Sequence, residues 1–211
     1  MTDPTRAFHP DTSPRAMPDT TRIVCIRHGQ STFNAAHKLG RGDPGLPDAR
    51  LTELGQAQAR AARERLRAIP FDLVVVSPLT RAIETAAILF GEHPSRPHVL
   101  VEVLHRECQE SSCDVGRAAS EIAAEFPHLD VGHLPEVWWH AEPGCEVGGY
   151  PVEPRPLFDA RVAAFRDWLR ARPETTIAVV GHGTFFYHLT GTFLENCGSI
   201  ELDLDAAPAA A

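Results

Sequence analysis

Three apolar runs in this chain each end abruptly in residues that could bind and attack an anionic group. The runs cover residues 23–26, 71–76 and 176–180, and the segments that follow them are Arg27-His28-Gly29, Ser77-Pro78-Leu79-Thr80-Arg81 and Gly181-His182-Gly183. An Arg and a His at a strand end, followed by a Gly that lets the backbone come close, suit the binding of an anionic group. The residue types therefore predict anion chemistry at one place, provided that the three segments meet.

Arg81 gives a second indication of a bound anion. Ser77 and Pro78 are typical of a helix start, and we expect Ser77 to be the N-cap and Pro78 the first helical residue. Arg81 then lies in or near the first turn, where the partial positive charge of the helix N-terminus disfavours a cation. An anion bound at that point would remove the conflict.

The elements that must position these residues alternate along the chain. The apolar runs are short and rich in β-branched residues, which predicts buried strands. Helical patterns follow them, so we expect an α/β fold, a three-layer α/β/α sandwich with a mostly parallel central sheet. Such sheets bind ligands beyond the carboxyl ends of their strands, which is where the Arg and His residues stand.

The helices are predicted from caps and from apolar spacing. One helix begins after Thr52, a suitable N-cap, and another covers residues 156–170. The residues expected on their inner faces are Ala57, Ala61, Leu66 and Ile69 in the first, and Leu157, Val162, Phe165 and Leu169 in the second. A further helix over residues 184–194 and an edge strand over residues 199–204 complete the pattern.

Residues 101–155 break the alternation of strands and helices. They contain one helical stretch near residues 118–126 and the pair Trp138-Trp139, which we expect to pack in the interior because aromatic side chains carry much core area. We interpret this segment as a cap inserted over the strand ends. The chain is then a single domain over residues 21–205, preceded by a polar, Pro-rich tail over residues 1–20 that we expect to be disordered.

The overall charge and the cysteines exclude several classes of protein. A net charge of −8 argues against a nucleic-acid-binding or membrane-binding surface, so positive charge must be gathered locally. The N-terminal segment has no apolar stretch, and we expect no signal peptide. The five cysteines are odd in number, widely spread and without a CxxC pair, which predicts reduced thiols in a cytoplasmic protein. We expect neither a metal nor a cofactor.

The ordered set of motifs resembles the histidine phosphatase superfamily, in its phosphoglycerate-mutase-like branch. The resemblance extends over about residues 23–204, and its motifs also include Leu51-Thr52-x-x-Gly55-x-x-Gln58-Ala59 and Ser77-Pro78-x-x-Arg81-Ala82-x-x-Thr85. It implies a metal-independent phosphatase that hydrolyses a small phosphomonoester through a phosphohistidine intermediate.

The resemblance also assigns roles to the polar residues at the strand ends. His28 is the nucleophile that becomes phosphorylated, and His182 holds the transferring oxygens in the transition state. Arg27 and Arg81 clamp the phosphoryl group, which carries about two negative charges. The expected substrate-binding residues are Arg27, Asn34, Arg81, His182 and Gly183.

A carboxyl group in the cap is expected to protonate the leaving oxygen. Glu107 stands about where the family keeps its acid, but the usual pattern is Leu-x-Glu and this sequence has Leu104-His105-Arg106-Glu107. Glu102, Glu110 and Asp114 therefore stay open as alternatives.

Two other functions fit parts of the same pattern. A mutase would return the phosphoryl group to a second hydroxyl and needs a cap that shields phosphohistidine from water. True mutases of this branch are somewhat longer, and their acid motif is not clearly matched here. A non-catalytic phospho-ligand binder is disfavoured because both His28 and His182 are present, so the sequence favours a phosphatase.

Overall fold

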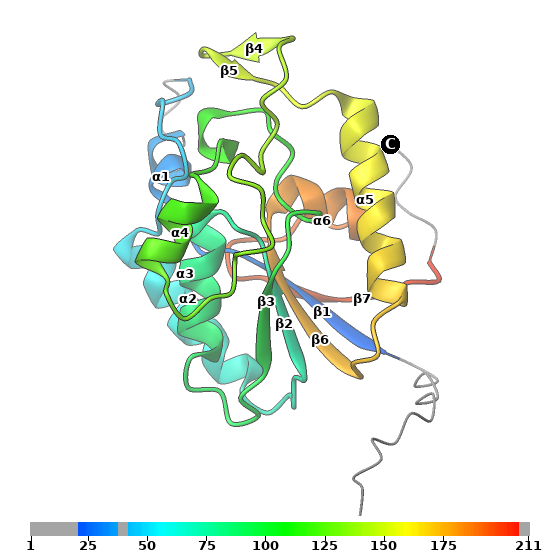
Figure 1. The fold of residues 1–211 in the computed structure, drawn as a ribbon. Coiled ribbons are helices and arrows are strands. Elements are labelled where there is room, and N and C mark those ends of the chain that lie inside the picture. The colour runs from blue at the N-terminus through cyan, green and yellow to red at the C-terminus, as the bar shows by residue number, and fades with distance from the viewer. Residues whose placement is uncertain (1–20, 38–41, 207–211) are drawn as a thin grey trace, which may run out of the picture.

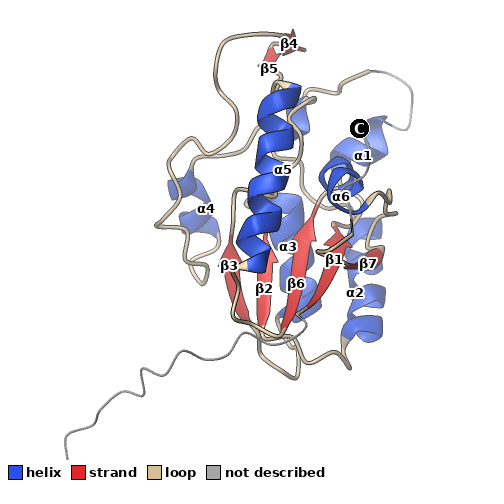
Figure 2. Ribbon diagram, turned by 90° about the vertical axis from the view of Figure 1, so that its right-hand side faces the viewer, coloured by secondary structure: helices blue, strands red, loops and turns tan. Residues whose placement is uncertain are grey.

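A five-stranded sheet forms the centre of the protein in the computed structural model, which describes residues 21–37 and 42–206. The predicted tail over residues 1–20 lies outside the described residues. Figure 2 shows the strands side by side in the order β3-β2-β6-β1-β7. Their bounds are β1 Arg22–Arg27, β2 Leu73–Val76, β3 His98–Val101, β6 Thr176–Gly181 and β7 Ser199–Leu202. Only the edge strand β7 runs antiparallel to its neighbour β1.

The strands are buried on both faces, as their continuous apolar sequences predict. Alternate residues of β1 enter different cores: Val24 and Ile26 join one hydrophobic cluster, and Ile23 and Cys25 join the other. Four helices supply the opposite walls of these cores. Figures 1 and 2 show α2 (Glu53–Leu66) and α3 (Thr80–Phe90) on one face of the sheet, and α5 (Arg155–Arg170) and α6 (Gly183–Thr190) on the other. The predicted three-layer α/β/α fold is therefore confirmed.

The strand register aligns the ends from which the polar segments emerge. Arg27 of β1 stands beside Gly181 of β6, and Val76 of β2 stands beside Val180. A backbone hydrogen bond continues the pairing of β1 with β6 one residue further, since the His28 amide donates to the Gly181 carbonyl at 2.9 Å. The three polar segments therefore begin at the same level, at the carboxyl ends of the parallel strands.

The segment between β3 and α5 lies beyond these strand ends, where the sequence places a cap. It contains the 3₁₀ helix η1 (Ser112–Asp114), α4 (Ala119–Glu125) and the hairpin of β4 (Glu146–Val147) and β5 (Tyr150–Pro151) (Figure 1). Trp138 is buried and its indole N–H donates to the carbonyl of Arg117 at 2.9 Å. Trp139 packs edge-on against it with ring centroids 5.6 Å apart and is partly buried, so the expected packing in the interior holds for Trp138 and only in part for Trp139.

The predicted start of α3 is wrong. The helix begins at Thr80, and Ser77 does not cap it. Asp48 supplies the cap from a distant loop, because its carboxylate accepts the backbone N–H of Thr80 at 2.7 Å. The Ser77 hydroxyl instead contacts His182. The sequence suggested Ser77 because it directly precedes the helix, whereas Asp48 is far from the helix in the chain and near it only in the fold.

Two predicted inner faces are also partly wrong. In α2 the buried residues are Gly55, Ala59, Ala62 and Leu66, whereas Ala57 and Ala61 are exposed. In α5 Phe158 is buried and Leu157 is exposed. The short edge strand β3 was not predicted, and α6 ends at Thr190 because Gly191 adopts a left-handed C-cap with φ of 77°.

Close contact between two backbones explains why α2 turns Gly55, Ala59 and Ala62 to the interior and not Ala57 and Ala61. A Cβ atom on Gly55 would lie 2.1 Å from the carbonyl oxygen of Gln30, and one on Gly29 would lie 2.5 Å from the carbonyl oxygen of Gly55. Thr52 fixes the same end of the helix, since its hydroxyl accepts the N–H of Gly55 at 3.0 Å. The segment after β1 therefore packs directly on the first turn of α2.

Membrane-spanning helices are not among these elements: within residues 21–37 and 42–206, no helix combines the length and the apolar run that a bilayer requires.

We predict that Gly55→Ala lowers the free energy of unfolding by about 1–3 kcal/mol, the usual cost of forcing an extra carbon into a packed site. Urea unfolding would measure the loss. Gly144→Ala is the matched control, because no atom lies within 4 Å of a Cβ at Gly144. Equal effects of the two substitutions would contradict the close contact.

His105 is a buried histidine next to the strand ends. Its Nε2 lies 3.1 Å from the carbonyl oxygen of Val180, and its ring stacks on Phe165 with centroids 4.8 Å apart. Burial lowers the pKa of His105 to about 3. Because the unfolded chain takes up a proton near pH 6.5 and the folded chain does not, this residue weakens the fold as the pH falls from about 6.5 towards 3.

We predict that His105→Leu flattens the pH dependence of stability between pH 6 and pH 4 by about one proton, or about 1.4 kcal/mol per pH unit. Val180 O keeps a partner in this variant, since it also accepts the Ser77 amide at 3.1 Å. Urea unfolding at several pH values would measure the slope. His98→Gln, at an exposed position, is the control and keeps the wild-type slope. An unchanged slope in His105→Leu would refute the assignment.

Candidate active site

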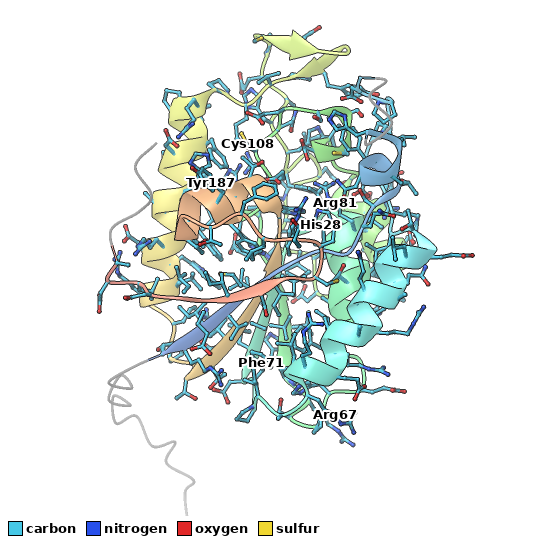
Figure 3. The ribbon with its side chains drawn as sticks, turned by 180° about the vertical axis from the view of Figure 1, so that it is seen from behind. His28, Arg67, Phe71, Arg81, Cys108 and Tyr187 are labelled. Atoms are coloured by element: carbon cyan, nitrogen blue, oxygen red, sulfur yellow. The ribbon has the colours of Figure 1, made fainter. Side chains whose placement is uncertain are left out.

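Two histidines and a guanidinium group meet beyond the strand ends. The Nε atom of Arg81 lies 3.2 Å from Nε2 of His28, and the rings of His28 and His182 have centroids 5.3 Å apart. Figure 3 shows His28 beside Arg81, far from Phe71 and Arg67 at the opposite end of the sheet. The structure thus brings together three of the residues that the strand-end pattern singled out.

Hydrogen bonds fix the protonation state of His28. Its Nδ1 lies 2.7 Å from the carbonyl oxygen of Gly29, which can only accept, so Nδ1 carries the proton. Nε2 then holds a lone pair, which accepts the N–H of Arg81. Burial, together with the charges of Arg81 and Arg27, lowers the pKa of His28 well below 6.5. The ring is therefore neutral at pH 7, with its nucleophilic nitrogen directed at Arg81.

His182 is equally enclosed, between β6 and the first turn of α6. Its Nε2 lies 2.7 Å from the Ser77 hydroxyl. Its Nδ1 is buried and has no partner among the described residues. Burial, followed by the charge of Arg81, lowers the pKa of His182 well below 6.5. A neutral imidazole with a free ring nitrogen can hydrogen-bond to an oxygen of a bound group.

Arg81 lies near a helix N-terminus, which disfavours a positive charge. An ion pair with the inserted cap segment compensates for this. Its Nη2 lies 2.9 Å from Oδ1 of Asp114, and Nη1 donates to the carbonyl oxygen of Cys113. Although burial alone would lower the pKa of Arg81, the negative charges of Asp114 and Glu107 raise it above its ordinary value. The anion beside Arg81 in this structure is thus a carboxylate of the protein.

Backbone hydrogen bonds hold the carboxylate of Asp114 in place beside Arg81. Its second oxygen accepts the amides of Ser111 at 3.1 Å and Glu110 at 3.3 Å. Burial raises the pKa of Asp114 to about 6, against the opposing charge of Arg81. Because both its oxygens accept hydrogen bonds, this side chain is built to hold Arg81 in place.

Arg27 lies at the side of the site that is less enclosed. Its Nη1 donates to the carbonyl oxygen of Leu194 at 2.6 Å, and its guanidinium carbon lies 4.8 Å from the ring centroid of Phe193. Its Nε is buried and has no partner among the described residues. Burial lowers the pKa of Arg27, and the charges of Glu107 and Glu195 oppose that shift. This guanidinium retains N–H groups for a bound anion.

Glu107 caps the helix that follows His182. Its carboxylate accepts the amides of Thr184 at 3.0 Å and Phe185 at 2.8 Å, both in the first turn of α6. The negative charge of Glu107 also acts on Arg27 and Arg81. Among the alternatives for the acid, Glu110 is exposed and Glu102 accepts the nearby amide of Leu104. Glu107 and Asp114 are the two candidates that the structure places at the site.

Asn34 is tied to the residue that precedes its own helix, and among the described residues it makes no hydrogen bond with either of the two histidines. It lies on α1 (Thr32–His37), where its Oδ1 accepts the amide of Ser31 at 3.2 Å and its own amide donates to the Ser31 hydroxyl at 3.1 Å. The side-chain amide group of Asn34 is left for a ligand.

Two further residues support His28 and were not predicted. The Asn196 side chain donates to the carbonyl oxygen of His28 at 3.0 Å, and the Thr85 hydroxyl accepts the amide of Gly29 at 3.1 Å. Thr85 belongs to the motif that begins at Ser77, so the sequence contained a signal for it. Asn196 stands in a loop without any motif and could not have been found.

Metal-ligating side chains do not gather at the site or elsewhere in the part of the chain that the structure describes: no group of three or more His, Cys, Asp or Glu side chains could hold an ion there.

Comparisons with known proteins agree with this geometry. The family model of the histidine phosphatase superfamily (branch 1) matches residues 23–204. A glucosyl-3-phosphoglycerate phosphatase from Mycolicibacterium vanbaalenii is 30% identical over 173 residues, which span 82% of this chain and 74% of the relative. A phosphoglycerate mutase-like protein from Arabidopsis thaliana is 27% identical over 212 residues, spanning 83% of this chain and 75% of the relative.

A solved structure supports the fold. The alpha-ribazole phosphatase from Shigella flexneri superimposes with a TM-score of 0.57 at 20% identity, over 87% of this chain and 90% of that chain. The named phosphatases among the relatives agree with the predicted reaction, and the predicted family is confirmed. On the match over residues 23–204, the chain belongs to the histidine phosphatase superfamily, branch 1.

Proposed function

We propose that the protein is a metal-independent phosphatase that hydrolyses a small phosphomonoester through a phosphohistidine on His28. The observation that carries the proposal is the state of His28, a buried neutral ring with its proton on Nδ1 and its lone pair on Nε2. A nitrogen in this state can attack phosphorus without first losing a proton. Two guanidinium groups beside it supply the positive charge that a phosphoryl group requires.

The first step transfers the phosphoryl group to the enzyme. The Nε2–P bond forms, and the bond between phosphorus and the ester oxygen breaks. The leaving oxygen takes a proton from Glu107 in its protonated form, which the negative charge of the bound phosphoryl group favours over the carboxylate. Arg27, Arg81 and a ring nitrogen of His182 hold the phosphoryl oxygens as negative charge moves onto them. We assign the Asn34 amide and the backbone N–H of Gly183 to the same bound group.

The second step releases phosphate. Water attacks phosphorus and gives its proton to the carboxylate of Glu107, and the Nε2–P bond breaks, so that His28 and Glu107 return to their initial states. Water as the acceptor makes the protein a phosphatase, whereas a second hydroxyl of the substrate as the acceptor would make it a mutase. The phosphatases among its relatives favour water.

We infer a cytoplasmic location from the cysteines. All five are free thiols in the structure, and Cys25, Cys108, Cys113 and Cys197 are buried. Free thiols persist in a reducing compartment.

We predict that His28→Ala abolishes turnover and leaves the fold intact. Wild-type protein incubated with a radiolabelled phosphate ester in the presence of EDTA should carry a label that is stable in alkali and labile in acid. Far-UV circular dichroism would check the fold, and His98→Ala, at an exposed position, is the control that keeps the label. A label that persists in His28→Ala would disprove the nucleophile.

We predict that Glu107→Gln slows the hydrolysis of alkyl phosphates by roughly 10²–10⁴-fold, the usual contribution of a general acid. The loss on p-nitrophenyl phosphate should be much smaller, since nitrophenolate leaves without a proton. Steady-state kinetics on both esters would measure the difference. Equal losses would indicate that Glu107 serves only as the cap of α6, and full activity would move the acid to Asp114.

A further inference from the structure

The loop of residues 192–198 contacts Arg27 and His28, the two active-site residues at the end of β1. Arg27 donates to the carbonyl oxygen of Leu194 at 2.6 Å, and the Asn196 side chain donates to the carbonyl oxygen of His28 at 3.0 Å. The loop follows α6, which lies beside His28 in Figure 3. Side chains of this loop are therefore held close to whatever His28 attacks.

Phe193 is an exposed aromatic residue on that loop. Its side chain retains 59% of its accessible surface, although its ring lies against the guanidinium group of Arg27. A Cβ atom on Gly183 would lie 3.2 Å from Cζ of Phe193, so the edge of the ring also reaches the first residue of α6. The ring thus lies next to two residues assigned to the phosphoryl site, Arg27 and Gly183, and its remaining surface is exposed to solvent.

The charge on the same loop is negative. Glu195 is exposed, and its charge, with that of Glu107, acts on Arg27. A carboxylate or a second phosphate on the alcohol part of a substrate would be repelled here. An uncharged apolar surface would instead gain contact with the exposed ring.

We propose that Phe193 binds the leaving group and that, together with Glu195, it selects phosphomonoesters whose alcohol part is uncharged and carries a ring with an apolar face. This inference rests on the proposed phosphatase function and names the substrate class of the same site. The guanidinium group covers one part of the ring of Phe193, and the exposed part is the surface that the substrate covers.

Benzyl phosphate and ethyl phosphate form a matched pair for the test. Both esters have a primary alkyl leaving group that needs the same acid, and they differ in the ring. We expect Phe193→Ala to lower the ratio of kcat/KM for benzyl over ethyl phosphate by roughly three- to tenfold, the range of a single aromatic contact. Phe193→Leu, which keeps an apolar side chain next to Gly183, should lower it less.

Val137→Ala is the control. Val137 is also exposed, at 50%, but it lines a separate cavity with Arg106 and Trp139. The ratio of kcat/KM for benzyl over ethyl phosphate in this variant should equal that of the wild type. For the charge, Glu195→Gln should raise the ratio of kcat/KM for 3-phosphoglycerate over benzyl phosphate by roughly two- to fivefold, the effect of one unit charge across water.

Each outcome decides the question. A ratio that falls in both Phe193 variants but not in Val137→Ala supports the inference. Equal losses on benzyl and ethyl phosphate would overturn it, because Phe193 would then only support Arg27, and unchanged ratios in all variants would overturn it as well. A wild-type protein that cleaves none of the three esters but still takes up the acid-labile label on His28 would overturn the substrate class alone. A protein that neither cleaves them nor takes up the label would overturn the proposed phosphatase function itself.

Discussion

A guanidinium group that is taken out of water must be neutralised where it lies, and the site is built around this requirement of Arg81. The residue is 2% exposed and stands at the positive end of α3, so that an unpaired charge would cost several kcal/mol. Asp114 meets the requirement from the cap at 2.9 Å. The cap must therefore pack onto the strand ends for the protein to fold. Burial lowers the pKa of His28 and of His182, and the charge of Arg81 that is stabilised in this way acts in the same direction.

The sheet sets the distances between these groups. β6 lies between β1 and β2, and its residue Gly181 is level with Arg27 while Val180 is level with Val76. A slip of one residue in either pairing would turn every side chain to the opposite face. Because each face packs closely against its own core, side chains exchanged by such a slip would no longer fit, and the fixed register brings the polar segments to one level.

The sequence predicted the parts of the fold and of the site that depend on neighbouring residues. Arg27, His28, Arg81 and His182 could be found because each directly follows a buried run or a helix start. The pairings that complete the site could not, since they join residues far apart in the chain. Asp114 is 33 residues from Arg81, Ser77 is 105 residues from His182, and Asn196 is 168 residues from His28. The inner face of α2 was misplaced for the same reason, because its rotation depends on the backbone of Gln30.

The carboxylate of Glu107 accepts two backbone amides at the start of the helix that follows His182, and a third from Cys108, its neighbour in the chain. The position of the acid relative to the second histidine therefore depends on backbone amides rather than on side chains of the inserted segment. Side chains of that segment other than Asp114 can therefore change without displacing the acid. A protein with this arrangement can change the compounds that it accepts over evolutionary time while its bond-breaking machinery stays the same.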